Sequence, residues 1–366
     1  MAQIRVEHLH KAFADFVAVR DSSFTVRDGE FFCLLGPSGC GKTTTLRMIA
    51  GLELPTSGRI LLGNEDVTFR RASGRDIAFV FQLFALYPHL TVRANVAYPL
   101  RCQGTARAEV TRRVEETARV LRITHLLDLP VSGLASGDRQ RVALGRAMVR
   151  EPAAFLLDEP LGALDSEFRE LMCGELRALH DRLGATTVYV THDQLEAMSM
   201  ADTIALMNAG AVEQIGPPQE VYDRPASLFV ADFIGSPPMN LIPFGGQIAV
   251  GERRVRIGGL QLEVPEAREA AAEGALVLGV RPEHVLLGEQ GPVRGSVLDT
   301  EYLGTTQVVT LATTLGTTIK ARVPADVPAR PGDQTGLAFR PEKLSLFHQP
   351  SGRALRSALH DGAAHG

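Results

Sequence analysis

The stretch FFCLLGPSGCGKTTTLRMIAGL, residues 31–52, is the clearest indication of the fold in the first part of this chain. Phe31 to Leu35 form an uninterrupted apolar run, which predicts a buried strand. A glycine-rich loop follows at once, and the apolar spacing in TTTLRMIAGL then predicts a helix. Strand, loop and helix in this order are the setting of a phosphate-binding loop in an α/β protein.

Residues 36–43, GPSGCGKT, match the pattern G-x-x-x-x-G-K-[ST]. At average residue frequencies, about one chain in a hundred of this length has such a match by chance. The glycines let backbone N–H groups and the helix N-terminus face phosphate, Lys42 brings positive charge, and Thr43 offers a hydroxyl to Mg²⁺. The alternative is a glycine turn that only opens a helix. The residues predicted to hold nucleotide here are Gly36, Pro37, Ser38, Gly39, Cys40, Gly41, Lys42, Thr43 and Thr44.

A second motif, FLLDEP at residues 155–160, ends an apolar strand on two adjacent acids. We expect Asp158 to hold Mg²⁺, directly or through water, and Glu159 to polarise an attacking water. Adjacent acids at a strand end can also be solvated turn residues. The phosphate loop upstream favours the catalytic alternative.

The composition excludes several classes of protein. With 366 residues, 45% hydrophobic and 22% charged, the chain is expected to form about two globular domains. A net charge of −4 gives no general attraction to nucleic acid. The four cysteines lack CxxC spacing, which argues against a disulfide framework or zinc site and favours a reducing cytosol. There is no signal core and no run of about 18 apolar residues, so we expect any membrane attachment to run through another protein.

The order of periodic segments predicts an α/β fold. Residues 1–35 alternate apolar and polar positions around a hairpin turn at Asp28-Gly29, which predicts an antiparallel β-layer. A helical stretch from about residue 106 to 150 precedes the strands AFLLD, TTVYVT and TIALM, with a long helix after Asp165. Helices between buried strands indicate a parallel core.

Beyond about Ser236 the pattern changes to short strands rich in Gly and Pro, which predicts a small β-barrel domain at 236–350. GVRPEHVLL around Arg281 and AFRPEKLSLF around Arg340 repeat Arg-Pro-Glu before an apolar strand. This repeat suggests two related β-subdomains. The last residues, 351–366, are expected to form a loose tail.

Five segments give the chain a resemblance to the ATPases of ABC transporters: the phosphate loop, Gln82 in VFQLFALYPHLTV, LASGDRQRVALGRAMV, FLLDEPLGALD and YVTHDQLEAM. They occur in the order of that family. The ending, with VEQIGPPQEVYDRP, FIGSPPMNLIP and GVRPEH, resembles the carbohydrate-importer branch, such as maltose and glycerol-3-phosphate importers. The resemblance implies an α/β ABC ATPase domain at 1–235 with a helical insert at about 83–150, then a tandem of OB-like barrels with regulatory and dimer-stabilising roles.

The resemblance also implies roles for single residues. Gln82 is similar to the family glutamine that reaches Mg²⁺, and His192 to the switch histidine that contacts the γ-phosphate. Phe13 lies where the family places an aromatic ring under adenine, but it can also be a core residue of the β-layer. Asp165 matches the residue that couples the two halves of the dimer, and it can also cap the helix beginning near Glu167. The implied catalytic residues are Glu159, His192 and Gln82, and the implied Mg²⁺ ligands are Thr43, Gln82 and Asp158.

One segment departs from the family pattern. The usual signature is Leu-Ser-Gly-Gly-Gln, whereas residues 134–138 read Leu-Ala-Ser-Gly-Asp. In the family this loop presses a serine hydroxyl and backbone N–H groups on the γ-phosphate held by the opposite subunit. Ser136 and Gly137 are the residues expected to take that role here. Because Ala135 has no hydroxyl and Asp138 is negative, we expect less efficient hydrolysis.

The resemblance implies an ATP- and Mg²⁺-dependent dimer, on the cytoplasmic face of the membrane, that energises uptake of a sugar or sugar-phosphate. Its implied partners are a second ATPase subunit, two membrane subunits and an extracytoplasmic solute-binding protein. Alternatives are an importer of another solute, such as polyamine, iron or sulfate, and a soluble ABC protein of repair or translation. Soluble members usually carry two cassettes or a coiled-coil insert, and this chain has one cassette and no heptad run.

Overall fold

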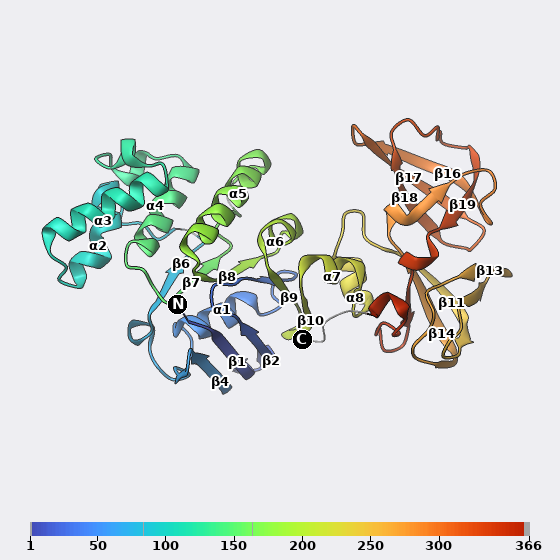
Figure 1. The fold of residues 1–366 in the computed structure, drawn as a ribbon, viewed down its shortest axis with the longest axis horizontal. Helices are drawn as coiled ribbons and strands as arrows, with labels where there is room; N and C mark the ends of the chain where they lie inside the picture. Colours follow the sequence, from blue (N-terminus) through green and yellow to red (C-terminus); the bar gives the residue numbers. More distant parts are fainter. Residues whose placement is uncertain (1, 83, 163, 362–366) are drawn as a thin grey trace. The chain divides into compact units, whose positions relative to one another are not determined.

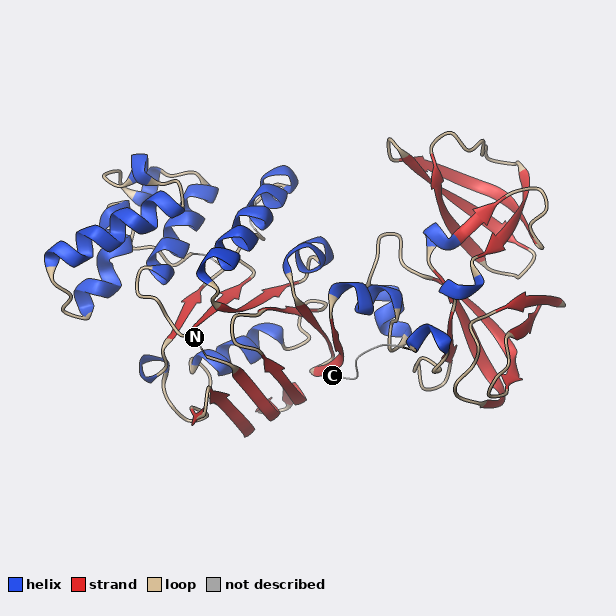
Figure 2. Ribbon diagram, viewed as in Figure 1, coloured by secondary structure: helices blue, strands red, loops and turns tan. Residues whose placement is uncertain are grey.

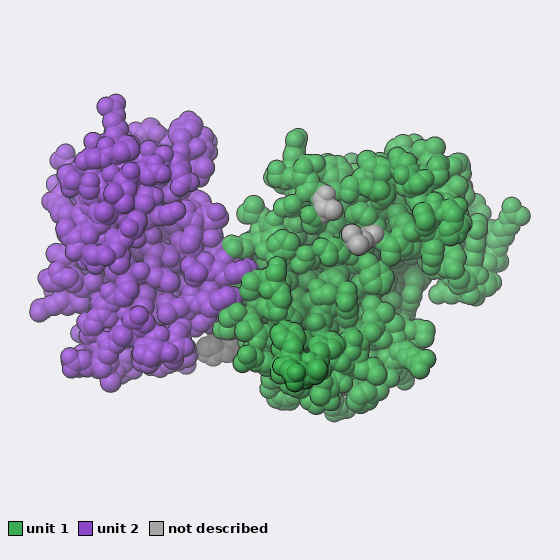
Figure 3. Space-filling view, turned by 180° about the vertical axis from the view of Figure 1, so that it is seen from behind, with its two compact units in different colours: residues 1–218 green, residues 219–366 purple. Residues whose placement is uncertain are grey.

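The computed structural model describes residues 2–82, 84–162 and 164–361. Contacts divide the chain into two compact units, Met1–Pro218 and Gln219–Gly366, which Figure 3 shows in green and purple. No helix in these described ranges has the length and apolar character needed to cross a membrane.

The first unit joins a large sheet to helices (Figures 1 and 2). Its strands are β1 (Ile4–Phe13), β2 (Phe16–Val26), β3 (Phe31–Leu35), β4 (Ser57–Leu62), β5 (Glu65–Asp66), β6 (Ile77–Val80), β7 (Ala154–Asp158), β8 (Thr186–Thr191), β9 (Thr203–Asn208) and β10 (Ala211–Gly216). Its helices are α1 (Lys42–Ala50), α2 (Val92–Cys102), α3 (Arg107–Val120), α4 (Ser136–Met148), α5 (Ser166–Leu183) and α6 (Gln194–Met200).

Over its described residues, the sheet runs in the order β5-β4-β1-β2-β10-β9-β3-β8-β7-β6. The β1–β2 and β1–β4 pairs are antiparallel, as predicted for the first 35 residues. The β3, β6, β7, β8 and β9 strands form the parallel part, and β3 lies between β8 and β9. The predicted parallel core is therefore confirmed.

The predicted hairpin turn at Asp28-Gly29 is wrong. The β1–β2 hairpin turns at Ala14 and Asp15 instead, where Phe13 pairs with Phe16. Asp28-Gly29 leads β2 into β3, and these strands do not pair because β3 is hydrogen-bonded to β8 and β9. The alternation of apolar residues locates strands, but competition among distant strands decides which of them pair.

The helical insert appears as a group of its own beside the sheet, formed by α2, α3 and α4 (Figure 1). The predicted helical stretch from about 106 to 150 contains α3 and α4, with two 3₁₀ turns between them, Thr124–Leu126 and Val131–Gly133. Within the group, Gly145 of α4 leaves room for Leu121, whose methyl would lie 3.0 Å from an added Cβ.

The second unit is β-rich, as predicted. It contains α7 (Pro218–Asp223), α8 (Leu228–Phe233), β11 (Asn240–Ile248), β12 (Arg254–Ile257), β13 (Leu260–Glu263), β14 (Ala271–Val280), β15 (Val285–Leu287), β16 (Val293–Tyr302), β17 (Thr306–Thr313), β18 (Thr318–Pro324), β19 (Gln334–Phe339) and β20 (Ser345–His348). Their sheets have the orders β11-β14-β20, β12-β13 and β15-β19-β16-β17-β18. One hydrophobic core contains residues of all three sheets, including Val255, Leu276 and Val309.

The two Arg-Pro-Glu segments form the same local structure, a 3₁₀ turn followed by a short strand. Their arginines differ, however: Arg281 is 1% exposed, whereas Arg340 lies on the surface. The Arg281 guanidinium lies 4.1 Å from the centre of the Tyr222 ring and donates hydrogen bonds to the Tyr222 carbonyl at 2.7 Å and to the Ile234 carbonyl. This arginine explains why α7 and α8 belong to the second unit, although the sequence places the boundary at residue 235.

The structure also differs from the expected loose tail. Ala354 and Leu355 are buried, and their backbone N–H groups donate to Ala226 and Leu346 at 2.9 and 2.7 Å. A short apolar pair is enough to anchor a mostly polar segment when neighbouring backbone carbonyls accept its N–H groups. Residues 362–366 of the predicted tail lie outside the described residues.

Candidate functional site

The loop between β3 and α1 depends on glycine at two close approaches. A Cβ on Gly36 would lie 2.3 Å from the Met207 carbonyl oxygen of β9, and one on Gly41 would lie 2.5 Å from that of Ala18 in β2. Gly41, with φ of 102°, is the N-cap of α1, and no side chain caps this helix end. The first turn of α1 also contains no acidic residue. The helix N-terminus therefore suits an anion.

Lys42 begins α1 and is 4% exposed. Its ammonium donates to the carbonyl oxygens of Gly36 and Pro37, each at 2.8 Å. These bonds place the positive charge inside the loop, next to the predicted phosphate position. Ser38 and Gly39 are exposed at the loop tip, Cys40 is buried, and Thr44 lies on the first turn of α1.

Thr43 and Asp158 meet at the carboxyl edge of the parallel strands. The Thr43 hydroxyl donates to Asp158 Oδ1 at 2.9 Å, although 115 residues separate them in sequence. Burial raises the pKa of Asp158, and the Thr43 hydrogen bond and the Arg47 charge oppose that rise. A hydroxyl and a carboxylate side by side are oxygen ligands of the kind that Mg²⁺ prefers, so this pair fits the predicted metal.

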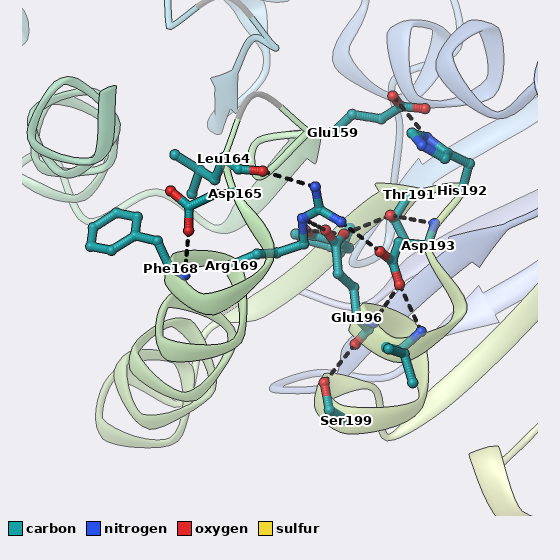
Figure 4. A network of polar contacts seen from close by, with 12 residues as sticks. Glu159, Leu164, Asp165, Phe168, Arg169, Thr191, His192, Asp193, Glu196 and Ser199 are labelled. Atoms are coloured by element: carbon teal, nitrogen blue, oxygen red, sulfur yellow. Dashed lines mark hydrogen bonds and ion pairs between the residues drawn. The ribbon is translucent and has the colours of Figure 1, made fainter. Parts of the chain in front are cut away.

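Glu159 and His192 also lie together, as Figure 4 shows. His192 Nδ1 is 3.2 Å from Glu159 Oε2. Glu159 has a positive φ of 43°, and its N–H donates to the Val190 carbonyl at 3.0 Å, which ties the end of β7 to β8. A strained backbone at this point aims the carboxylate toward the turn after β8.

Gln82 follows β6 and is exposed. It lines a cavity of about 400 Å³ together with Ser136 and Arg139. Among the described contacts, no hydrogen bond joins Gln82 to Thr43 or Asp158. Its predicted role at Mg²⁺ thus remains a prediction.

The signature segment packs against α5 of the same chain. Ala135 is the N-cap of α4 and offers no side-chain cap, so Ser136 begins the helix. A Cβ on Gly137 would lie 2.1 Å from the Phe168 ring. Asp138 Oδ1 lies 3.7 Å from Arg141, which also contacts Glu175 at 3.3 Å. Asp138 in the first turn also suits the helix dipole, so its charge has partners within the chain.

Phe13, at the end of β1, has 42% of its surface exposed, which argues against the alternative of a core phenylalanine. The Lys11 ammonium lies 4.6 Å from the centre of its ring. Lys11 is itself held by Glu53 Oε1 at 2.6 Å and the Leu54 carbonyl at 2.7 Å. The ring is thus available for stacking and supported by a fixed cation.

Asp165 is the N-cap of α5 and accepts from the Phe168 N–H at 2.9 Å. The capping alternative is therefore confirmed. A coupling role across a dimer is compatible with it and stays a prediction.

Sequence patterns predicted no role for two arginines, Arg169 and Arg146. Arg169 of α5 contacts Leu164, Asp193 and Glu196 (Figure 4). Arg146 of α4 donates to the carbonyl oxygens of Phe84 and Ala85, at 3.0 and 2.7 Å, where both residues have positive φ. Neither arginine belongs to a short motif with its own mechanism, and their contacts span 5 to 62 residues.

The comparisons with known proteins agree on one family. The family model described as ABC transporter matches residues 19–162, the MalK OB fold domain matches 235–285, and the TOBE domain matches 278–347. The chain is 44% identical to the trehalose/maltose import ATP-binding protein MalK of Thermococcus litoralis, over 97% of this chain and 100% of that protein. It is 52% identical to the sn-glycerol-3-phosphate import ATP-binding protein UgpC 3 of Rhizobium etli, over 78% of this chain and 79% of that protein.

Solved structures resemble the first unit. The cbiO1 protein of Clostridium perfringens, part of an ABC transporter complex, aligns with a TM-score of 0.56 and 29% identity, over 60% of this chain and 89% of that one. A dimeric bacterial ABC transporter cassette aligns with a TM-score of 0.54 and 30% identity, over 59% of this chain and 98% of that one. Because the identity to one relative extends over that relative's full length, the chain belongs to the ATP-binding proteins of ABC transporters.

Proposed function

We propose that this chain is the ATP-hydrolysing subunit of an ABC importer for a sugar or sugar-phosphate. The observation that carries the proposal is the meeting of Thr43 with Asp158, and of Glu159 with His192, at the ends of adjacent parallel strands. The carboxyl edge of such a sheet is the usual place for a bound ligand. Four groups from three separate parts of the sequence are thereby available to one Mg·ATP.

Each of these residues has a separate proposed role. Lys42 and the N-terminus of α1 would bind the phosphates, and Thr43 and Asp158 would hold Mg²⁺, which would supply positive charge to the phosphates. Glu159 orients the attacking water and accepts its proton. His192 holds the Glu159 carboxylate through Nδ1, and in its imidazolium form it also donates from Nε2 toward the γ-phosphate as negative charge develops. Phe13 stacks on the base, a contact worth about 1–3 kcal/mol in comparable sites.

The signature segment indicates how two ATPase subunits would assemble. Ser136 and Gly137 act on the nucleotide of a second ATPase subunit, and two copies form a dimer whose closure on ATP moves two membrane subunits. The relatives that match are named as import proteins for trehalose, maltose and sn-glycerol-3-phosphate, which supports a carbohydrate or sugar-phosphate as the solute. The chain then lies at the cytoplasmic face of the membrane, and a solute-binding protein delivers the solute from outside.

The test is purification of the chain with its membrane partners, followed by ATPase assays with a panel of solutes. We expect a sugar or sugar-phosphate, presented with its binding protein, to stimulate hydrolysis. Stimulation by a polyamine, iron or sulfate alone would contradict the solute assignment and leave the ATPase intact. Recovery of an active ATPase that associates with no membrane protein would contradict the transport function itself.

A further inference from the structure

Arg169 lies between two segments that carry the chemistry, and no motif accounts for it. It sits in the first turn of α5, with 30% of its side chain exposed. Its Nη2 donates to the Leu164 carbonyl at 2.9 Å, and its Nη1 donates to Asp193 Oδ2 at 3.0 Å. One planar guanidinium therefore joins the segment after Glu159 to the turn that contains His192 (Figure 4).

The Asp193 side of this contact is fixed by several bonds. Asp193 caps α6, because its Oδ1 accepts from Leu195 N at 2.8 Å and Glu196 N at 3.3 Å. Its own N–H donates to the Thr191 hydroxyl at 2.9 Å. His192 lies between Thr191 and Asp193, so the hydrogen bonds of its two neighbours set its position.

The buried carboxylate of Glu196 hydrogen-bonds to the strand that precedes the His192 turn. Glu196 is 4% exposed and accepts from the Thr191 hydroxyl at 2.6 Å and the Tyr189 hydroxyl at 2.8 Å. Arg169 Nε lies 3.6 Å from its other oxygen. Burial raises the pKa of Glu196, and the hydrogen bonds from Thr191 and Tyr189 oppose that rise more than the Arg169 charge does. Arg169 thus completes a network that reaches from β8 through α6 to the start of α5.

We propose that Arg169 is a positioning residue for hydrolysis, because it holds the Leu164–Asp165 segment and the His192 turn in one fixed arrangement. This inference rests on the proposed ATPase function. Arg169 touches neither of the predicted phosphate-binding residues nor the predicted Mg²⁺ ligands in the described contacts. Its loss should therefore lower the rate of hydrolysis and leave ATP affinity unchanged.

The test compares Arg169→Met with Arg177→Met. Arg177 is a matched control on the same helix with 31% of its side chain exposed, and it binds the Met200 carbonyl and Asp202, both at 2.8 Å, away from the His192 turn. We expect Arg169→Met to lower kcat about tenfold or more, since small misplacements of reacting groups are costly, with the Kd for ATP within about twofold of the unmodified protein. Arg177→Met should keep kcat. Arg169→Lys, whose single ammonium cannot fork between Leu164 and Asp193, should recover only part of the rate.

A double-mutant cycle assigns the effect to the Asp193 contact. Asp193→Asn keeps an oxygen for the helix cap and loses the charge. If Arg169 acts through Asp193, the double variant should be no slower than the worse single variant by more than about twofold. Rate losses that multiply, or equal losses in Arg169→Met and Arg177→Met, would overturn the proposal.

A measurement without nucleotide separates this inference from the proposed function. Hydrogen exchange of the full chain should show faster exchange in peptides containing Leu164 and in peptides containing His192 for Arg169→Met, and in neither for Arg177→Met. An unmodified protein that never hydrolyses ATP would refute the function. Unchanged exchange together with unchanged kcat in Arg169→Met would refute the positioning role.

Discussion

The phosphate loop edge and the signature segment are both expected to contact ATP, yet their contacts within the chain differ. At the first, Thr43 bonds to Asp158, and Glu159 lies beside His192, so groups distant in sequence converge. At the second, Gly137 packs on Phe168, and Asp138 pairs with Arg141 on its own helix. Among the described residues, no hydrogen bond or ion pair joins residues 134–138 to the phosphate loop.

Within one chain, the contacts gather Thr43, Asp158, Glu159 and His192 at one edge of the sheet, whereas the signature segment packs on α5. The edge is organised by the parallel sheet, whose strand ends must lie together. The signature segment is organised by helix packing on α5 and directs Ser136 toward a cavity that it shares with Gln82. A nucleotide sandwiched between two copies, as proposed above, would need both parts.

Glu159→Gln, at the carboxyl edge of the sheet, should have the largest effect on the rate of hydrolysis. We expect hydrolysis to fall at least about a hundredfold, because the amide cannot accept a proton from water, whereas Asp158 and Lys42 still bind Mg·ATP. An ATP-bound dimer should accumulate. The measurement is single-turnover hydrolysis, with Glu116→Gln on the exposed face of α3 as the control. Turnover near that of the unmodified protein would remove Glu159 from the catalytic role.

Restoring the family signature at residues 134–138 should raise the rate of ATP hydrolysis. Ala135→Ser, Ser136→Gly and Asp138→Gln together should raise kcat about tenfold or more, since one hydrogen bond to a charged group is worth about 1.5–3 kcal/mol. The measurement is kcat in the assembled transporter.

The Asp138–Arg141 contact offers a competing outcome for the signature. If Ser136 already contacts the γ-phosphate and Asp138 is neutralised by Arg141, Ser136→Ala alone should abolish most hydrolysis. The triple variant should then give no gain. That pair of results would show that the departure from the family pattern is compensated within this chain.

Gly137→Ala tests whether the signature segment depends on α5. The added methyl would overlap the Phe168 ring, and overpacking of this kind costs about 1–3 kcal/mol. Chemical denaturation should detect the loss. Phe168→Ala in the same chain should relieve the overlap, so a double variant as unstable as the sum of the single variants would contradict the contact.

Truncation should affect ATP binding least. A chain ending at Pro218 should bind ATP within about twofold of the full chain, because every predicted site residue lies before that position. A chain ending at residue 235 should bind equally well but aggregate more readily, since Ala231 of α8 would lose its packing against Val277 and Phe347. If light scattering shows the two fragments to be equally soluble, α7 and α8 need no contact with the rest of the second unit.

Local sequence patterns predicted the strand, loop and helix at residues 31–52, the strand that ends at Asp158 and the strand that His192 follows. Such elements follow from local periodicity and from glycines at fixed spacing, which act over a few residues. The resemblance to ABC transporter ATPases then ordered the motifs along the chain.

The tertiary structure was needed to show which strands pair, why Asp28-Gly29 is no hairpin, and that Arg281 donates to carbonyl oxygens at the ends of α7 and α8. It alone placed Arg169 between Leu164 and Asp193, and Phe168 against Gly137. These contacts join residues through space, where several partners compete for the same surface or carbonyl. A short sequence pattern therefore cannot predict which of the competing partners forms the contact.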